Sequence, residues 1–286
     1  MFIQALYEGI VNGAILSLVA MGIALIWGVM NILSFAQGEF LMLGMYCALF
    51  LNKYCGMDPI ASIPIAMVVL FFIGTFVYKS MIGPVLKGPV LSQRLLTFAL
   101  SMVIANLMLI CIGGSNYTIT DLWFTGTINL GFIVVSIQKL VPLVASILIT
   151  LFLFLFMNKT KTGKAISATS MHKQAAELVG INTEKSYTLA FGLSSAITGA
   201  AGCVMTYYYY INPTVGSSFL FFGFVAVAMG GFGSILGAFF GGLIMGIVDV
   251  MSGLYLNNTV KYLCVCIVYI LIVSIRPNGL FGGKNK

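Results

Sequence analysis

Charged residues are scarce in this sequence. Asp, Glu, Lys and Arg make up 7% of the 286 residues, hydrophobic residues make up 60%, and the mean hydropathy is +1.08. Globular domains carry about 25% charged residues, so this composition excludes a soluble domain of ordinary size. The net charge of +7 does not indicate nucleic-acid binding, because the basic residues lie beside apolar runs, where they set the orientation of a membrane protein.

Metal-binding and catalytic residue patterns are also missing. His172 is the only histidine, and none of the six cysteines forms a Cys-x-x-Cys pair. A single histidine without nearby cysteine or aspartate cannot build a metal site, and no His/carboxylate or Cys/His set lies within the apolar runs. The sequence contains no Gly-Lys-Ser or Gly-Lys-Thr, so it has no ATP-binding motif of its own. We therefore expect no catalytic residue, no metal and no cofactor on this chain.

Long apolar runs recur along the whole sequence with short gaps between them. A helix needs about 20 apolar residues to cross a hydrocarbon core of about 30 Å. The sequence therefore predicts an all-α integral membrane protein, a polytopic bundle of about eight or nine transmembrane helices in one domain over residues 1–286. The predicted spans are Tyr7–Trp27, Glu39–Leu51, Ile60–Tyr78, Leu95–Ile112, Leu140–Met157, Ser186–Tyr208, Phe219–Met229, Gly237–Leu254 and Val260–Ile275.

Two of these spans, Glu39–Leu51 and Phe219–Met229, are short. Apolar segments of about 10 to 14 residues are typical of half-helices or re-entrant segments rather than of full crossings. The stretch from Asn31 to Gln37 before the first of them suggests a broken helix, whose free backbone amides could receive a carboxylate. We expect discontinuous segments at both places.

Basic residues concentrate in three regions, two gaps between the spans and the C-terminal tail. Because lysine and arginine accumulate in cytoplasmic loops, we expect all three regions in the cytoplasm, and counting spans back then places the N-terminus outside. The gap Gly113–Gln138, which contains Asp121 but no basic residue, is then external. The three basic regions contain Lys79, Lys87 and Arg94; Lys159, Lys161, Lys164, Lys173 and Lys185; and Arg276, Lys284 and Lys286.

Many of the 32 glycines are spaced for close helix packing. Small residues four positions apart let helix backbones approach closely inside a membrane bundle. The stretch "GGFGS" at 230–234 has the composition of a tight turn between two spans. The glycine pairs with this spacing are Gly9 with Gly13, Gly237 with Gly241, and Gly242 with Gly246.

One polar segment stands out, in the predicted cytoplasmic loop 158–185. Its helix signals run from Ser170 to Val179, with apolar residues at helical spacing on one face and His172, Lys173 and Glu177 on another. Gly180 suits the left-handed position just past a helix end, in a Schellman stop. Amphipathicity alone leaves two interpretations open, a helix that lies on lipid headgroups and a helix that contacts a protein.

Four stretches resemble one family. "QAAELVG" (174–180) is similar to the Glu-Ala-Ala-x-x-x-Gly motif that importer permeases of the ATP-binding-cassette (ABC) class present to their ATPases, with Gln174 where Glu is usual. In the same order along the chain, "GVMNILSFAQGEFLMLGMY" (28–46), "AVAMGGFGSILGAFFGGLIMGIVD" (226–249) and "RPNGLFG" (276–282) resemble permease subunits of branched-chain amino-acid importers of the LivH/LivM type, closer to LivH. The resemblance covers nearly the whole chain.

The resemblance implies a bacterial inner-membrane permease subunit that works with a second, homologous permease subunit in a hetero- or homodimer. Two cytoplasmic ATPase subunits, which bind ATP and Mg, and an extracytoplasmic substrate-binding protein would complete the importer. It further implies that the polar segment is a coupling helix docked on an ATPase. The residues expected at that contact are His172, Lys173, Gln174, Ala175, Ala176 and Gly180.

A small set of polar residues within or beside the spans could line a transport pathway. An acid at the bilayer centre costs about 2.5–3.5 kcal/mol on insertion scales, so Glu39 and Asp249 each need a reason to be there. Glu39 could instead offset a helix dipole in a first turn, and Asp249 could instead hydrogen bond to a neighbouring helix. The candidate pathway residues are Asn31, Gln37, Gly38, Glu39 and Asp249.

These observations favour a permease that takes up Leu, Ile, Val or related small polar solutes. The same architecture in related permeases carries urea, short amides or nucleosides, and the pathway residues do not decide among these substrates. The alternative from another class is an ion-coupled secondary transporter, which would need intramembrane ionisable groups for its coupling ion.

Overall fold

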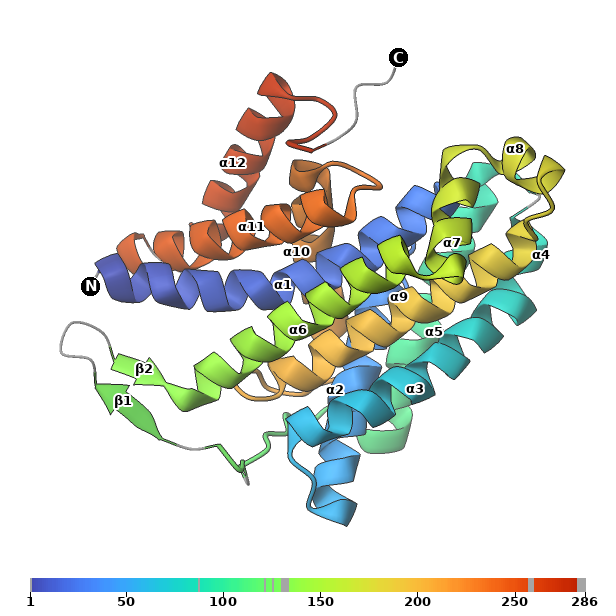
Figure 1. Cartoon of the computed structure of the whole chain (residues 1–286). Coiled ribbons are helices and arrows are strands. Elements are labelled where there is room, and N and C mark those ends of the chain that lie inside the picture. The colour runs from blue at the N-terminus through green and yellow to red at the C-terminus, as the bar shows by residue number, and fades with distance from the viewer. Residues whose placement is uncertain are drawn as a thin grey trace.

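Every predicted span is a helix in the computed structural model (Figure 1). The structure describes residues 2–86, 88–120, 122–124, 126–129, 134–256 and 260–281. Lys87, Asp121, Lys284 and Lys286 lie outside these ranges. The helices that correspond to predicted spans are α1 (Phe2–Met30), α2 (Gln37–Cys55), α3 (Pro59–Val77), α5 (Val90–Ile112), α6 (Ile137–Lys159), α9 (Thr183–Met205), α10 (Val215–Gly230), α11 (Ile235–Tyr255) and α12 (Lys261–Ile275).

Shorter elements mark the two ends of the bundle. A π-helical turn (Tyr78–Ile82) and α4 (Gly83–Val85) extend α3, and α7 (Lys161–Met171) and α8 (Lys173–Leu178) lie beside them. At the opposite end, β1 (Thr127–Asn129) pairs antiparallel with β2 (Val134–Ser136). We call these the α7–α8 end and the hairpin end. In Figure 1 the N-terminus of α1 lies at the left, on the same side as β1 and β2, and α12 rises from near it towards the C-terminus.

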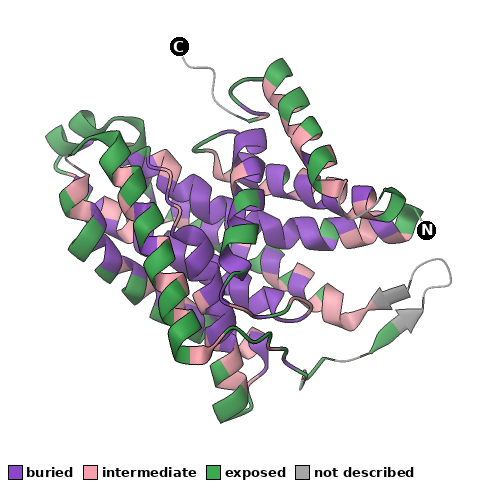
Figure 2. Cartoon of the chain, turned by 180° about the vertical axis from the view of Figure 1, so that it is seen from behind, coloured by how far each residue is buried: buried purple, intermediate pink, exposed green. Residues whose placement is uncertain are grey.

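Among the described residues, six helices are long and apolar enough to cross a membrane: α1, α3 with its extension to Val85, α5, α6, α9 and α11. They differ sharply in burial. The most apolar window of α1 is 94% buried and that of α9 is 89% buried, whereas that of α5 is only 11% buried. Figure 2 shows the buried centre and the exposed outer helices. The outer helices present apolar side chains outward, which is the surface that lipid requires.

The bundle consists of two halves with inverted orientation, residues 2–112 and 183–275. Helix α1 packs against α11 in the same way that α9 packs against α3, and α2 contacts α9 as α10 contacts α1. Helices α1 and α9 are antiparallel, since Asn31 just after α1 and Thr183 at the start of α9 line one cavity at the α7–α8 end. The same packing plan is therefore used twice, in opposite directions.

The predicted close glycine packing is confirmed. A Cβ added to Gly246 would lie 2.2 Å from the Gly13 Cα, and one added to Gly242 would lie 2.5 Å from the Ser17 Cα, so this pair faces α1. Gly241, in contrast, packs on α10, where an added Cβ would lie 2.1 Å from the Ala226 carbonyl oxygen. Neighbouring glycines of α11 therefore bring its backbone into contact with two different helices, α1 and α10.

The two short predicted spans meet at their N-terminal tips. Helix α2 has 19 residues, so the expected length Glu39–Leu51 is too short, while α10 has 16. In Figure 1, α2 crosses the direction of the long helices. A Cβ on Gly38 would lie 2.4 Å from the Gly216 carbonyl oxygen, so the first turns of α2 and α10 touch through backbone. Both helices start inside the bundle, as discontinuous helices do.

Asp58 ties together three segments at the hairpin end. Its carboxylate accepts hydrogen bonds from the Ile60 amide at the start of α3, from the Trp123 amide and from the Tyr207 hydroxyl after α9. Burial, together with the hydrogen bond to this carboxylate, raises the pKa of Tyr207, which keeps the phenol protonated as a donor. The sequence signal for this residue is Asp58 before Pro59, an N-cap followed by proline at the first helical position.

The C-terminal segment closes the end of α10. Leu280 and Phe281 donate backbone hydrogen bonds to the Met229 and Gly230 carbonyls, both 2.9 Å long. The last carbonyls of a helix have no partner within the helix, so this segment satisfies two of them. The adjacent "GGFGS" stretch is the predicted turn, with Gly231 and Gly233 at positive φ. The "RPNGLFG" motif thus packs onto the motif at 226–249.

Candidate functional site

Two adjoining cavities open at the hairpin end. They measure about 350 Å³ and 240 Å³ and share Asn12, Tyr209, Asp249 and Lys261 in their linings. The first has charged side chains and also apolar ones in its lining, and the second has a larger set of apolar side chains. The apolar side chains of the second cavity include Leu16, Val215, Phe219 and Phe222.

Asp249 is the centre of a polar network in these cavities. Its Oδ1 lies 3.3 Å from the Lys261 ammonium, and its Oδ2 accepts a hydrogen bond of 3.3 Å from the Asn12 amide. The Tyr209 hydroxyl donates to the Asn12 side-chain oxygen at 3.2 Å. The hydrogen bond to a neighbouring helix is as one interpretation predicted. Asp249 also lines both cavities, while its role in a transport pathway stays a prediction. Lys261 and Asn12 were not predicted.

A buried polar cluster fills the centre of the bundle. The Gln37 side-chain oxygen accepts hydrogen bonds from Ser194 (3.2 Å) and Thr198 (3.1 Å) of α9, and Ser194 also bonds the Gly22 carbonyl of α1. The Gln37 amide nitrogen has no partner among the described residues. This cluster holds the start of α2 against the two central helices, and Ser194 and Thr198 were missed because serine and threonine are common in membrane helices.

Glu39 lies beside the contact between the two helix tips. The residue is only 5% exposed, and its Oε2 has no hydrogen-bond partner among the described residues. A Cβ on Gly216 would lie 3.1 Å from that oxygen, so the carboxyl group faces the first turn of α10 while it belongs to the first turn of α2. Two helix N-termini, each with partial positive charge, therefore surround one acid.

A larger cavity of about 890 Å³ opens at the α7–α8 end. Asn31 lines it, with a left-handed φ of 55° at the break between α1 and α2. Lys79, Lys173 and Glu184 supply charge to its wall. The predicted pathway residues are thus spread along the bundle: Asp249 at one end, Gln37, Gly38 and Glu39 at the closed centre, and Asn31 at the other end.

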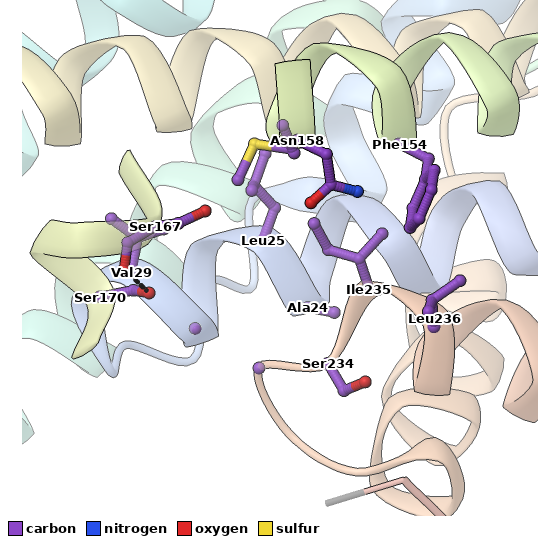
Figure 3. A pocket seen from close by; sticks show the side chains of 13 residues that line it. Ala24, Leu25, Val29, Phe154, Asn158, Ser167, Ser170, Ser234, Ile235 and Leu236 are labelled. Atoms are coloured by element: carbon purple, nitrogen blue, oxygen red, sulfur yellow. Dashed lines mark hydrogen bonds between the residues drawn. The ribbon is translucent and has the colours of Figure 1, made fainter. Parts of the chain in front are cut away.

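A smaller cavity of about 210 Å³ separates α7 from the loop before α11 (Figure 3). Phe154 and Asn158 of α6 lie on one side of it, and Ser234 and Leu236 lie on the other. Its lining has no charged side chain. It therefore leaves open space beside α7 without offering a site for an ion.

The predicted coupling helix is divided in two, so its expected extent is wrong. His172 has extended backbone (φ −153°, ψ 99°) between α7 and the six-residue α8. The predicted stop is confirmed: Gly180 has φ 82°, its amide bonds the Glu177 carbonyl, and the Ile181 amide bonds the Ala176 carbonyl. His172, Lys173, Gln174 and Ala175 are exposed, as is Gly180, but Ala176 is buried within the chain itself.

A helical bundle with a polar cavity at each end and a closed centre defines a membrane transport protein. The family model described as "Branched-chain amino acid transport system / permease component" matches residues 5–275. The chain belongs to this family of permease components. It is accordingly a multi-pass membrane protein and a non-catalytic transport subunit.

Individual relatives span almost the whole chain. The high-affinity branched-chain amino acid transport system permease protein LivH of Salmonella typhimurium is 27% identical over 295 residues, which cover 98% of this chain and 96% of the relative. LivH of Escherichia coli K12 is 28% identical with the same coverage. The probable LivH of Methanocaldococcus jannaschii is 29% identical over 98% of this chain and 92% of its own length.

One solved structure shares the fold. PsaBC from Streptococcus pneumoniae, in complex with Fab, aligns with a TM-score of 0.54 over 97% of this chain and 93% of that chain, at 16% sequence identity. At this identity the likeness shows the arrangement of helices alone.

Proposed function

We propose that this chain is the permease subunit of an ATP-driven importer for branched-chain amino acids in a bacterial plasma membrane. A second homologous permease, two cytoplasmic ATPases and an external binding protein would complete the complex. The hairpin end faces outside, and the α7–α8 end and the C-terminus face the cytoplasm. Most of the described lysines and arginines lie away from the hairpin end. This distribution supports the orientation, because cytoplasmic loops are enriched in lysine and arginine.

The observation that supports ATPase coupling best is an exposed apolar surface at the α7–α8 end. Met171, Leu178 and Val179 are 85%, 89% and 75% exposed, and His172 and Lys173 lie between them in sequence. Apolar side chains grouped on an otherwise polar segment are typical of a protein contact. We call Met171, Leu178 and Val179 the docking surface.

The docking surface is held rigidly to the rest of the chain. The Thr183 hydroxyl donates a 2.8 Å hydrogen bond to the Glu177 carboxylate, and the Lys173 ammonium lies 5.8 Å from the centre of the Tyr187 ring. Both partners belong to α9, which continues to Ser194 and Thr198 at the closed centre. A displacement of α8 by an ATPase would therefore be transmitted along α9 to the contacts that close the pathway.

Transport then follows from alternating access. With the helix tips in contact, the cavities at the two ends are separated by Gln37 and by the Gly38–Gly216 contact. Closing and separation of the ATPases would shift the balance between states open to either side. The α7–α8-end cavity, with Asn31 in its wall, is the exit in this scheme.

Leu178→Glu tests the proposal. The substitution places a charge in the docking surface without disturbing the chain, because Leu178 is 89% exposed. In vesicles that contain the complete importer, we expect loaded binding protein to stimulate ATP hydrolysis at least about tenfold less, which corresponds to about 1.4 kcal/mol. Gln174→Glu is the matched control: it adds the same charge at an exposed neighbouring position and restores the family motif, so stimulation should be retained.

The results separate the alternatives. Normal stimulation and leucine uptake in Leu178→Glu would overturn the docking surface. A helix that only lies on lipid predicts weaker membrane contact with full stimulation. Uptake by the wild-type chain without ATP would instead support an ion-coupled carrier and reject the importer.

A further inference from the structure

The hairpin-end cavities hold an acid, Asp249, and a phenol, Tyr208, each with one oxygen that accepts or donates no hydrogen bond among the described residues. Asp249 is 8% exposed, and although its Oδ1 lies 3.3 Å from the Lys261 nitrogen, that oxygen makes no hydrogen bond to any described residue. The Tyr208 hydroxyl in the same lining is also buried without a partner among the described residues. Buried polar groups normally find hydrogen-bond partners, so these groups point to a ligand in the cavity.

Neutral groups hold the acid in place. The Asn12 amide donates to Asp249 Oδ2, and Tyr209 in turn donates to the Asn12 oxygen. One carboxylate oxygen is therefore fixed by α1 and by the segment after α9, while the other faces Lys261. The carboxylate has a defined orientation even when its cation moves away.

The adjoining cavity supplies the apolar counterpart. Leu16, Val215, Phe219 and Phe222 line it together with Asp249 and Lys261. At about 240 Å³ it has room for an aliphatic side chain, and it shares its polar lining residues with the cavity of about 350 Å³.

We propose that these two cavities form a binding site for an aliphatic α-amino acid zwitterion on its way through the permease. The ligand ammonium pairs with Asp249, the ligand carboxylate pairs with Lys261, and the side chain lies against Leu16, Phe219 and Phe222. The site rests on the proposed function and adds to it a place and a recognition chemistry.

Charge balance explains the selectivity of such a site. Removing one partner of a buried ion pair costs much free energy, because the other charge is left buried without compensation. A zwitterion that enters between Asp249 and Lys261 gives each of them a new partner, so no charge is left uncompensated before or after binding. A monoanion or a monocation satisfies only one of the two. Urea, short amides and nucleosides carry no charge with which to replace the pair.

A second ion pair at the cavity rim provides the control. The Lys139 ammonium lies 2.8 Å from Glu8, and the side chains are 36% and 34% exposed. This pair has ordinary hydrogen-bond geometry, and its exposed position lets water screen it. Both residues line the larger of the two cavities, and neither is among the proposed partners of the ligand.

Protection of an introduced cysteine tests the site directly. Ser218 is exposed and lines the second cavity, so Ser218→Cys in a chain whose six native cysteines are replaced gives one reactive thiol there. In vesicles with the complete importer and no ATP, an impermeant thiol reagent reports on it. We expect leucine at ten times its dissociation constant to slow labelling about tenfold. Asp249→Asn or Lys261→Gln should raise the leucine concentration required at least about 30-fold, and Lys139→Gln should not.

Ligand analogues test the charge exchange in the unaltered site. Relative to leucine, 4-methylpentanoate lacks the ammonium group and isoamylamine lacks the carboxylate, so each should protect at least about 30-fold more weakly than leucine, and urea should not protect. These arms remain decisive if the variants do not assemble. Absence of protection by leucine, or protection by the analogues that is as strong as protection by leucine, overturns the site. Normal ATP-driven leucine uptake alongside that result would leave the proposed function intact, whereas protection without ATP-driven uptake would reject the function and keep the site.

Discussion

The two inverted halves share a packing plan but place their acids differently. In residues 2–112, the helix after the break, α2, begins with Gln37 and Glu39, whereas its counterpart α10 contains no charged residue. In residues 183–275 the buried acid is Asp249 on α11, and the counterpart helix α3 contains no acid. The closed centre and the charged cavity are each lined by residues of both halves, but the buried acid of the centre, Glu39, comes from the first half and that of the cavity, Asp249, from the second.

The halves also differ in how closely their helices approach. Gly246 of α11 faces the backbone of α1 at Gly13, while Gly74 of α3 faces the Ser195 side chain of α9. The Ser195 hydroxyl can rotate away from a methyl group added at Gly74, which leaves only the 2.7 Å approach of its Cβ, whereas the atoms that Gly246 meets are all backbone atoms. The α1–α11 contact is therefore the more demanding of two equivalent contacts.

Opposite accessibility of the two ends is the largest effect expected from the inverted arrangement. Asn116 and Lys164 are both exposed, at the hairpin end and in α7. With the native cysteines replaced, Asn116→Cys should react fully with an impermeant thiol reagent in intact cells, and Lys164→Cys should react only after lysis. Labelling of Lys164→Cys alone from outside would show that the orientation is the reverse of the proposed one. Labelling of both cysteines from outside would contradict the placement of the two ends on opposite sides of the membrane.

Alanine at the two matching glycines should destabilise the protein to different degrees. Gly246→Ala forces two helix backbones apart. It should lower the free energy of unfolding by about 3 kcal/mol, the upper end of the range typical of overpacking, because backbone atoms cannot rotate out of the way. Gly74→Ala should cost about 1 kcal/mol, the lower part of that range. The measurement is the thermal unfolding midpoint in detergent. Gly56→Asn is the control, because Gly56 has a left-handed φ of 63° and no neighbour within 4 Å of an added Cβ. Equal losses at the two matching sites would contradict the difference in approach.

Neutralising the acid of the first half should have the smallest effect. Glu39→Gln keeps the side-chain shape and loses only the interaction of a charge with two helix N-termini, about 1 kcal/mol. We therefore expect a shift of a few degrees in the unfolding midpoint and nearly normal leucine uptake. Glu39→Lys, which puts a cation against both N-termini, should prevent assembly. Loss of uptake in Glu39→Gln with an unchanged midpoint would assign Glu39 a role in transport rather than in closing the centre.

The functional surface at the α7–α8 end was only partly accessible to sequence reasoning. The stop at Gly180 was predictable because it depends on local backbone conformation, and both hydrogen bonds of that stop are present. The division at His172 was not, because α7 and α8 are separated by their packing against the bundle rather than by a helix breaker. Ala176 belongs to the expected ATPase contact, yet it is 3% exposed within this chain alone. Leu178 and Val179 are the residues that the surface offers instead.

The candidate site shows the same limit. Asp249 was identified because an acid inside an apolar span is costly wherever it lies. Its partners could not be found from spacing, since Asn12 lies 237 positions away in the sequence. Lys261 is near Asp249 in sequence, but only the fold of α12 back onto α11 brings its ammonium to the carboxylate.

The sequence by itself determined the class of protein, the positions of the spans, the short helices and the glycines at which backbones meet, because composition, run length and four-residue spacing are local properties. The tertiary structure decided which helix each glycine contacts, that α1 and α9 form the centre, and that the tips of α2 and α10 close it. The reason is physical: in a membrane the side chains that face lipid are as apolar as those that face another helix. Apolar periodicity then no longer distinguishes the inside of the bundle from its surface, and only the packing of the complete fold does.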